Sequence, residues 1–433
     1  MGAEPVKQIM YGVTDFALMR NPRRPAYFVD HTELIRELEN TARYVIFLRP
    51  RRFGKSLLCA ILQSYYDVDY ADRFVEFFGG LKIGENPTEE HNRYLILDFD
   101  FSLVYKLDGA VEQSFNDICS SRIDKFVTDN AARLPDGVPE KVLAKVGAHA
   151  KLAELCLRLK HIVSPVKLYV FIDEYDNFTN TVLAESRTRY EELCHGDGFF
   201  KQFFTVLKSA TTGTDAPITR MFITGVSPVT MDDVTSGFNI GANISHEPAF
   251  AAFVGFTHDD LKEMLAYYRE RAGFDFDPEK VYRDLCAWYD NYRFAVAPSA
   301  GGREVPSVAN ATLVLGFMRY FLQYQQYPMD FIDENLRVDY RKIRHLITEN
   351  RKINGNFHKL EEILERQSVT ATLARSFQAK DISRGDNFIS LLYYFGLIAV
   401  AGEDMGETVL KIPNLTVREF MNDFLPRRRS GFL

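Results

Sequence analysis

Four short apolar runs alternate with amphipathic stretches in the first part of the chain. They cover Tyr44–Leu48, Tyr94–Asp100, 168–172 and 218–224, and they are rich in β-branched and aromatic residues. Such runs, separated by helical patterns, are typical of parallel strands that are covered on both faces of a sheet. Helical spacing of apolar residues predicts intervening helices at about 31–40, 109–130, 140–160 and 198–212.

The pattern changes after Phe256. Helical spacing continues at about 278–289, 310–324, 339–349 and 357–367, and Thr257 is placed to cap a further helix. A strongly apolar stretch at 388–400, a turn and a run at 408–412 resemble the helix and hairpin of a winged-helix-like element, and a short amphipathic helix follows at 416–424. The sequence therefore predicts an α/β core over residues 1–250. A mostly helical lid and a winged-helix-like region are expected over 251–433.

Composition limits the cellular compartments and the classes of partner that fit this chain. The 433 residues carry a formal net charge of −7 and five cysteines that are widely spaced. An odd number of scattered cysteines argues for reduced thiols in an intracellular, cytoplasmic or nuclear setting. No stretch has the apolar length that a membrane span needs, and the N-terminus lacks an apolar signal core. The net charge does not support nucleic-acid binding, and the basic run at 427–429 is interpreted as a solvated tail.

The first motif follows the strand Tyr44–Leu48. Pro50 ends that strand, because it lacks a backbone donor, and Gly54, Lys55 and Ser56 then open a helix. A strand, a tight loop, Gly-Lys-Ser and a helix form a phosphate-binding loop, in which amides at the helix start face the phosphates. The lysine reaches the β- and γ-phosphates and the serine completes a Mg²⁺ shell. The general pattern has Gly where this chain has Arg49, so an ordinary helix start remains the alternative.

The second motif ends the strand at 168–172. Asp173 and Glu174 follow this strand directly. In phosphate-loop ATPases such an Asp holds Mg²⁺, and a following Glu polarises the attacking water as a general base. A strand that simply ends in acidic loop residues is the alternative, but the two motifs together favour nucleotide binding. We expect Lys55 and this acidic pair to meet at adjacent strand tips.

Several further residues are candidates with a structural alternative. Tyr27 or Phe28 precedes the phosphate loop and is placed to line a base pocket, although a core position fits equally. Thr224 and Ser227 follow the strand at 218–224 and are placed to contact a γ-phosphate, with plain turn chemistry as the alternative. Arg293 is placed to stabilise phosphate charge from the lid, although pairing with Asp290 fits as well.

Taken together, five segments resemble one known family. FLRPRRFGKSLL, LYVFIDEYDNF, ITGVSP, WYDNYRF and LKIPNLTVREF resemble the AAA-ATPase-like phosphate-loop proteins, over about residues 11–424. The resemblance implies that Arg49 is the family's own form of the loop. It implies metal and water handling by Asp173 and Glu174 (Walker B). It also implies nucleotide contacts from the Walker A loop residues Arg52, Phe53, Gly54, Lys55, Ser56 and Leu57.

Two departures from the family pattern stand out. Asn291 occupies a position where Gly is common, and only eight residues follow Leu425, which leaves no room for the PD-(D/E)xK nuclease-like domain that many members carry. The leading hypothesis is a Mg²⁺-dependent ATPase, with ATP preferred over GTP on the resemblance alone. A nucleotide-gated switch or scaffold with little turnover, and the ATPase part of a nuclease-associated system, are the alternatives. A protein partner or a homo-oligomer is compatible with each hypothesis.

Overall fold

A parallel five-stranded sheet forms the centre of the first half of the protein. The computed structural model describes residues 5–104, 110–160, 167–234, 241–296, 304–332, 337 and 356–422. The strands run in the order β2-β3-β4-β1-β5. Their bounds are Tyr44–Leu48 (β1), Tyr94–Asp100 (β2), Lys167–Asp173 (β3), Ile218–Gly225 (β4) and Ala242–Asn243 (β5). The four predicted strands are thus confirmed to within one residue at each end, whereas the two-residue β5 is too short to leave a sequence pattern.

The register of the sheet sets the position of the two motifs. Asp100 of β2 pairs with Asp173 of β3, and Leu48 of β1 pairs with Gly225 of β4. The carboxyl ends of the strands therefore lie along one edge. The expectation that the two motifs follow adjacent strands is wrong, because β4 lies between β1 and β3. The motifs still meet, since the loops after β1 and β3 lie on either side of the end of β4.

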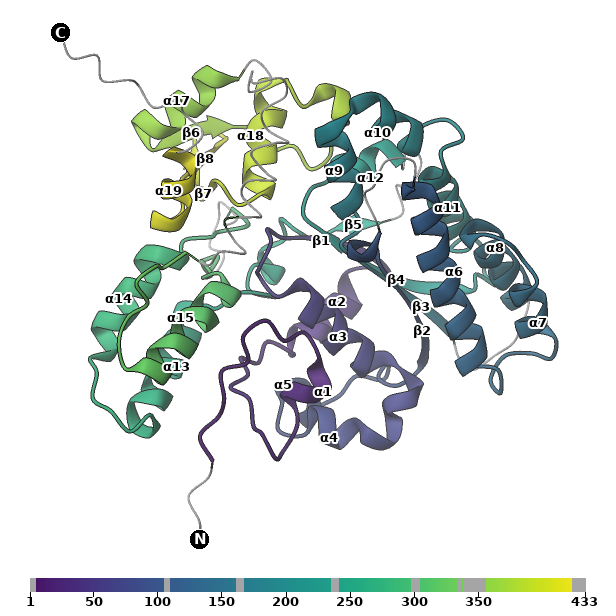
Figure 1. Ribbon diagram of the computed structural model, residues 1–433, viewed down its shortest axis with the longest axis horizontal. Coiled ribbons are helices and arrows are strands. Elements are labelled where there is room, and N and C mark those ends of the chain that lie inside the picture. Colours follow the sequence, from purple (N-terminus) through teal and green to yellow (C-terminus); the bar gives the residue numbers. More distant parts are fainter. Residues whose placement is uncertain are drawn as a thin grey trace.

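Helices cover both faces of this sheet (Figure 1). Side chains alternate along β2, so Tyr94 contacts Tyr66 of α3 on one face and Phe99 contacts Phe203 of α11 on the other. The predicted helix at 140–160 is wrong in one respect, because Gly147, at φ +83°, separates two helices there. The helices of this half are α1 (Phe16–Met19), α2 (Leu34–Thr41), α3 (Lys55–Tyr66), α4 (Phe74–Phe78), α5 (Lys82–Glu85), α6 (Val111–Asp129), α7 (Val138–Leu143), α8 (Ala148–Leu159), α9 (Asn177–Glu185), α10 (Arg187–Cys194), α11 (Phe199–Ser209) and α12 (Val229–Val234).

The second half of the chain combines helices with a small antiparallel sheet. Figure 1 shows this half beside the central sheet. Thr257 caps α13 as predicted, in a reciprocal capping box with Asp260. The predicted helix at 339–349 lies outside the described residues. The elements are α13 (His258–Arg271), α14 (Pro278–Tyr289), α15 (Ala311–Tyr324), α17 (Phe357–Arg366), β6 (Ser368–Ala371), α18 (Gly385–Tyr394), β7 (Ala399–Asp404), β8 (Glu407–Lys411) and α19 (Leu415–Asn422), with sheet order β6-β8-β7.

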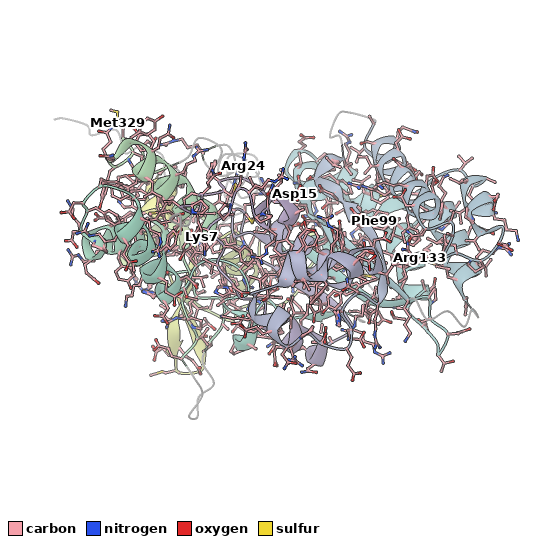
Figure 2. The ribbon with its side chains drawn as sticks, turned by 90° about the horizontal axis from the view of Figure 1, so that it is seen from below. Lys7, Asp15, Arg24, Phe99, Arg133 and Met329 are labelled. Atoms are coloured by element: carbon pink, nitrogen blue, oxygen red, sulfur yellow. The ribbon has the colours of Figure 1, made fainter. Side chains whose placement is uncertain are left out.

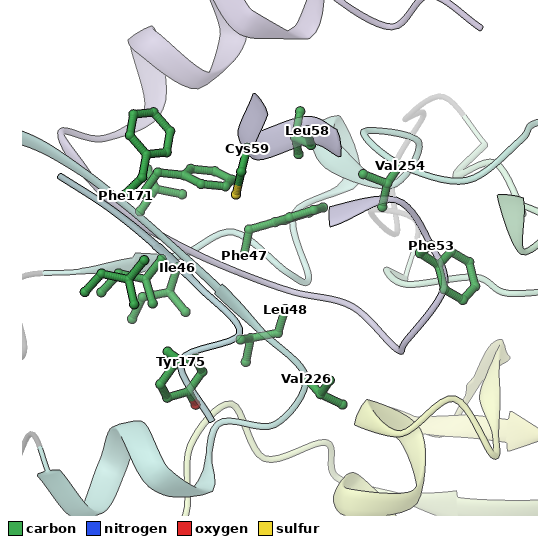
Figure 3. Close-up of a cluster of buried hydrophobic side chains, with 14 of the residues drawn as sticks. Ile46, Phe47, Leu48, Phe53, Leu58, Cys59, Phe171, Tyr175, Val226 and Val254 are labelled. Atoms are coloured by element: carbon green, nitrogen blue, oxygen red, sulfur yellow. The ribbon is translucent and has the colours of Figure 1, made fainter. Parts of the chain in front are cut away.

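One continuous cluster of buried hydrophobic side chains extends through both halves. Figure 3 shows the part below the phosphate loop, where Leu58 and Cys59 of α3 lie over Phe47 of β1. The N-terminal segment adds a second connection. Lys7, labelled in Figure 2, contacts α13: its amide donates to the Tyr267 hydroxyl at 2.9 Å, and its carbonyl accepts from the Tyr268 hydroxyl at 2.8 Å. In the part of the chain that the structure describes, no helix is both long and apolar enough to cross a membrane.

Candidate nucleotide-binding site

The phosphate loop leads directly into α3. Gly54 has φ +101°, a left-handed conformation that glycine adopts without strain, and a Cβ at this position would meet no atom within 4 Å. Lys55 is the first residue of α3, and its ammonium donates to the carbonyls of Arg49 and Pro50, each at 3.1 Å. Because the first amides of a helix lack partners within the helix, the start of α3 presents free donors beside this ammonium.

Arg49 faces away from this loop. Its side chain is 1% exposed, and its guanidinium carbon lies 4.4 Å from the ring centre of Phe47 and 4.2 Å from that of Phe294. Burial lowers its pKa to about 10, so the group remains charged at neutral pH. It donates to three backbone carbonyls, those of Leu48 (2.9 Å), Ser245 (2.7 Å) and Phe250 (2.9 Å). The residue that replaces the Gly of the general pattern is therefore a buried anchor for the loop.

The second half of the chain contacts the loop on its other side. The ring of Phe53 packs edge-on against Tyr292 at 4.9 Å and Phe294 at 5.4 Å. Thr312, at the start of α15, donates its amide to the carbonyl of Arg52 at 3.1 Å. Asn291 has φ +69°, which explains why glycine is common at that position in the family resemblance, and asparagine tolerates this conformation better than most residues.

Carboxylates converge at the other side of the loop. The Ser56 hydroxyl forms a hydrogen bond with Asp173, and Asp100 is paired with Asp173 across the two strands. Burial, followed by the negative charge of Glu174, raises the pKa of Asp173 to about 6. A cation at this position would relieve both effects, because it compensates the charge that burial and a like-charged neighbour penalise.

The turn after β3 holds Glu174 in an unusual conformation. Glu174 has φ +52°, its amide donates to Asp173 Oδ1 at 2.9 Å, and its carboxylate accepts a hydrogen bond from the Asn177 side chain. Asp176 is buried and accepts hydrogen bonds from the amides of Val226 (3.0 Å) and Ser227 (2.8 Å). The turn is thereby fastened to the end of β4, which fixes the position of the acidic pair.

These groups line a cleft of about 690 Å³. Its lining includes the loop residues Arg52 to Leu57 with Asp100, Asp173 and Glu174, and also Tyr27, Phe28, Val254 and Leu315. Pockets for small molecules and cofactors have about 300–1,000 Å³. The cleft is thus large enough for a nucleoside triphosphate, and its lining includes both charged and apolar side chains.

Most of the predicted site residues meet in this cleft, but Thr224, Ser227 and Arg293 do not line it. Thr224 is fully buried, and Ser227 is also buried and accepts the amide of Val229 at 3.2 Å, which is turn chemistry. The Arg293 guanidinium lies 3.5 Å from Glu304. The described geometry gives neither Thr224 nor Arg293 support as a phosphate contact, and their roles stay predictions. Arg293 does not pair with Asp290 either, because that carboxylate faces His258.

Sequence reasoning missed Asp100 and Asn177 as site residues. The signal for Asp100 was present, because it ends an apolar strand in the same way as Asp173 does. Parallel neighbouring strands that both end in Asp bring two carboxylates to one edge. Asn177 gave no signal of this kind, since its contact depends on the left-handed conformation of Glu174.

The comparisons with known proteins agree with this geometry. A family model described as "Predicted AAA-ATPase" (AAA-ATPase_like) matches residues 10–235, slightly more than half of the chain. The chain belongs to this predicted AAA-ATPase family. The matched segment of this AAA-ATPase-like chain contains β1 to β4 and both motifs. One curated relative, "Uncharacterized protein in vnfD 5'region" of Azotobacter chroococcum mcd 1, is 24% identical over 428 residues, which cover 97% of this chain and 70% of that protein.

Proposed function

We propose that this AAA-ATPase-like chain binds ATP together with Mg²⁺ and hydrolyses its γ-phosphate bond. The observation that carries the proposal is the convergence of two distant motifs in one cleft. Lys55 and Ser56 line this cleft, and the Ser56 hydroxyl forms a hydrogen bond with Asp173, which precedes Glu174. A phosphate loop that meets an acidic strand end in this way is the arrangement that phosphate-loop ATPases use.

The residues of the cleft suit a magnesium ion. A hydroxyl and carboxylates are the hard oxygen ligands that Mg²⁺ prefers, and Ser56 and Asp173 would hold it, with Asp100 beside them. When bound, the ion supplies positive charge that offsets the phosphate oxygens. The half-buried Asp173 carboxyl, whose pKa is raised, gains a compensating charge in the same event.

Residues of the chain itself bind the phosphates, activate the water molecule and contact the base. The Lys55 ammonium now contacts two loop carbonyls, and it turns from them toward the phosphates when a nucleotide binds. The amides at the start of α3 bind phosphate oxygens. Glu174 orients and polarises a water molecule as general base, and Asn177 holds its carboxylate. Tyr27 and Phe28 contribute to the base end of the cleft, where the preference for ATP over GTP rests on the family.

A second candidate is a nucleotide-gated switch with little turnover. It is favoured by the contacts of Phe53 and Arg49 with Tyr292 and Phe294, which connect the phosphate loop to the second half of the chain. We propose a core over residues 1–250 and a lid with a winged-helix-like region over 251–433. In this reading a protein partner, a second copy or a nucleic acid reads the position of that second half.

Two substitutions test the leading proposal. Lys55→Ala is expected to abolish ATP binding, and Glu174→Gln is expected to keep binding and to lose steady-state phosphate release. Lys125→Ala, an exposed change on α6, is the matched control and is expected to behave as the wild type. Equal ATP affinity in the wild type and in Lys55→Ala would overturn the nucleotide site. Tight binding with no phosphate release in the wild type would favour the switch.

A further inference from the structure

A second cluster of chemically reactive groups lies outside the nucleotide cleft. His258 is the first residue of α13, whereas Cys286 and Asp290 lie in and just after the last turn of α14. One donor atom from each residue lies within 4.8 Å of the other two. None of the three lines the nucleotide cleft. A nitrogen, a sulfur and an oxygen donor therefore converge where two lid helices meet.

Asp290 is the unusual member of this cluster. Its side chain is 1% exposed, and among the described residues neither carboxylate oxygen has a hydrogen bond of good geometry. The His258 ring faces this carboxylate, with its Nε2 2.9 Å from Asp290 Oδ2. The Asn291 amide and the Ser307 hydroxyl also lie close to this carboxylate, so its burial is compensated in part by neutral donors. Full compensation of a buried carboxylate takes an opposite charge. A bound cation would supply that compensation.

The contacts of the His258 ring also fit a metal ligand. Its Nδ1 contacts the hydroxyl of Tyr282, whereas Nε2 faces both Asp290 and the Ser307 hydroxyl, the latter at 3.0 Å. Metal-binding histidines usually have their other ring nitrogen fixed by a hydrogen bond of this kind. A Ser-His-Asp hydrolase would instead place the serine and the aspartate on opposite ring nitrogens, so the same contacts argue against that chemistry.

We propose that His258, Cys286 and Asp290 form a zinc-binding site. Imidazole, thiolate and carboxylate are the three ligand types that Zn²⁺ takes in proteins, and three protein ligands leave one position of a tetrahedral shell for water. The side chain of His258 is 44% exposed, which gives the ion access from solvent. The mixed donor set excludes a preference for Mg²⁺ or Ca²⁺, which take oxygen ligands.

This zinc site would join parts of the lid that meet only through side chains. It links the start of α13 to the end of α14. Asp290 directly precedes the segment whose Tyr292 packs on Phe53 of the phosphate loop. Zinc is therefore expected to raise the apparent melting temperature of the nucleotide-free protein, because a ligand that binds only the folded state stabilises it.

Cobalt substitution tests the site without nucleotide or turnover. In untagged protein, Co²⁺ is expected to bind at one equivalent with a thiolate-to-cobalt charge-transfer band, and Zn²⁺ is expected to displace it. Cys286→Ser is expected to remove the band, and Tyr282→Phe to weaken binding about 10- to 100-fold. His149→Gln, which alters an exposed histidine elsewhere, is the control and retains the band. Absence of the band in the wild type, or its persistence in Cys286→Ser, overturns the proposal.

A measurement on the wild type covers the case in which Cys286→Ser does not fold. Zn²⁺ is expected to slow alkylation of Cys286 at least about 10-fold, since the bound thiolate is not free to react. The four other cysteines are buried, so peptide mass spectrometry resolves the one that reacts. Equal alkylation rates with and without Zn²⁺ contradict the site. Neither readout requires ATP, so failure here leaves the proposed ATPase function standing.

Discussion

The side-chain amide of Asn177 donates a hydrogen bond to the carboxylate of Glu174, whose backbone is held at φ +52°. If Glu174 polarises water, this bond positions the general base. Asn177→Ala is therefore expected to lower kcat about 10-fold, part of the 10²–10⁴ that general base catalysis contributes. ATP affinity is expected to change less than about twofold, because Asn177 offers no positive charge to the phosphates. Phosphate release and equilibrium binding check the two expectations.

The control for this substitution is Glu185→Ala, at the exposed end of the same helix. It is expected to leave both quantities unchanged. A loss of ATP affinity in Asn177→Ala that equals the loss of kcat would contradict the positioning role.

The raised pKa of Asp173 predicts how the stability of the folded protein depends on pH. Its folded value of about 6 lies above the ordinary 3.8, chiefly through burial, so the folded protein binds the proton more tightly than the unfolded chain. Asp173 thus favours folding most below pH 4, and this contribution is lost as pH rises toward about 6, by up to about 3 kcal/mol. Asp173→Asn removes the titration. Without nucleotide, the free energy of unfolding of the variant is expected to rise relative to that of the wild type between pH 4 and 6.5. Urea denaturation at several pH values measures this difference.

The same carboxyl predicts how Mg²⁺ affects binding. The proton must leave Asp173 before the carboxylate can bind a cation, so Mg²⁺-dependent ATP affinity is expected to fall as pH drops through about 6. Titrations at pH 5 and pH 7.5, with and without Mg²⁺, measure this. An identical Mg²⁺ effect at both pH values would refute the assignment of Asp173 to the metal.

Arg49 is expected to matter for folding and not for phosphate contact. Arg49→Met keeps most of the side-chain volume but leaves the carbonyls of Leu48, Ser245 and Phe250 without their donor. Each unsatisfied buried acceptor costs about 1–3 kcal/mol, so the expected loss is about 3 kcal/mol or more. Arg187→Ala, which breaks an exposed pair with Glu191, is the control and is expected to change stability little. Chemical denaturation compares the two variants.

Gly225, at the end of β4, has no room for a side chain. A Cβ there would lie 2.4 Å from the ring of Tyr175 and 2.5 Å from Asp176 Oδ1. Gly225→Ala is expected to cost about 1–3 kcal/mol through overpacking and to reduce phosphate release, because the turn that carries Glu174 must shift. Gly402→Ala on β7 is the matched control, since a Cβ there meets no atom within 4 Å. Equal stability of both variants would show that the turn adapts freely.

The sequence was sufficient to locate four of the five strands of the central sheet. Strands such as Tyr94–Asp100 are continuous apolar runs, and a local pattern of that kind reports burial directly. The same holds for Thr257, whose capping box depends only on neighbouring residues. Lys55, Ser56 and Asp173 line one cleft because motif and strand position together determine where they lie, and their roles at a nucleotide stay predictions.

What the sequence could not predict depends on contacts between distant segments. The order of the strands, with β4 between β1 and β3, leaves no trace in any single apolar run. The helical spacing of apolar residues continues through residues 144–147, which lie between α7 and α8 and include Gly147 at φ +83°. The buried role of Arg49 was also hidden, because its acceptors Ser245 and Phe250 lie about 200 residues away.

The surroundings of Arg49 have a consequence for truncated forms of the protein. The match to the family model ends at residue 235, before Ser245, Phe250 and Phe294. A recombinant fragment cut at that boundary would retain every motif of the ATPase, yet it would uncover a charged guanidinium and the aromatic ring of Phe53. Such a fragment is expected to be poorly soluble and to bind nucleotide weakly, because the part of the chain that packs around Arg49 extends beyond the part that the family model matches.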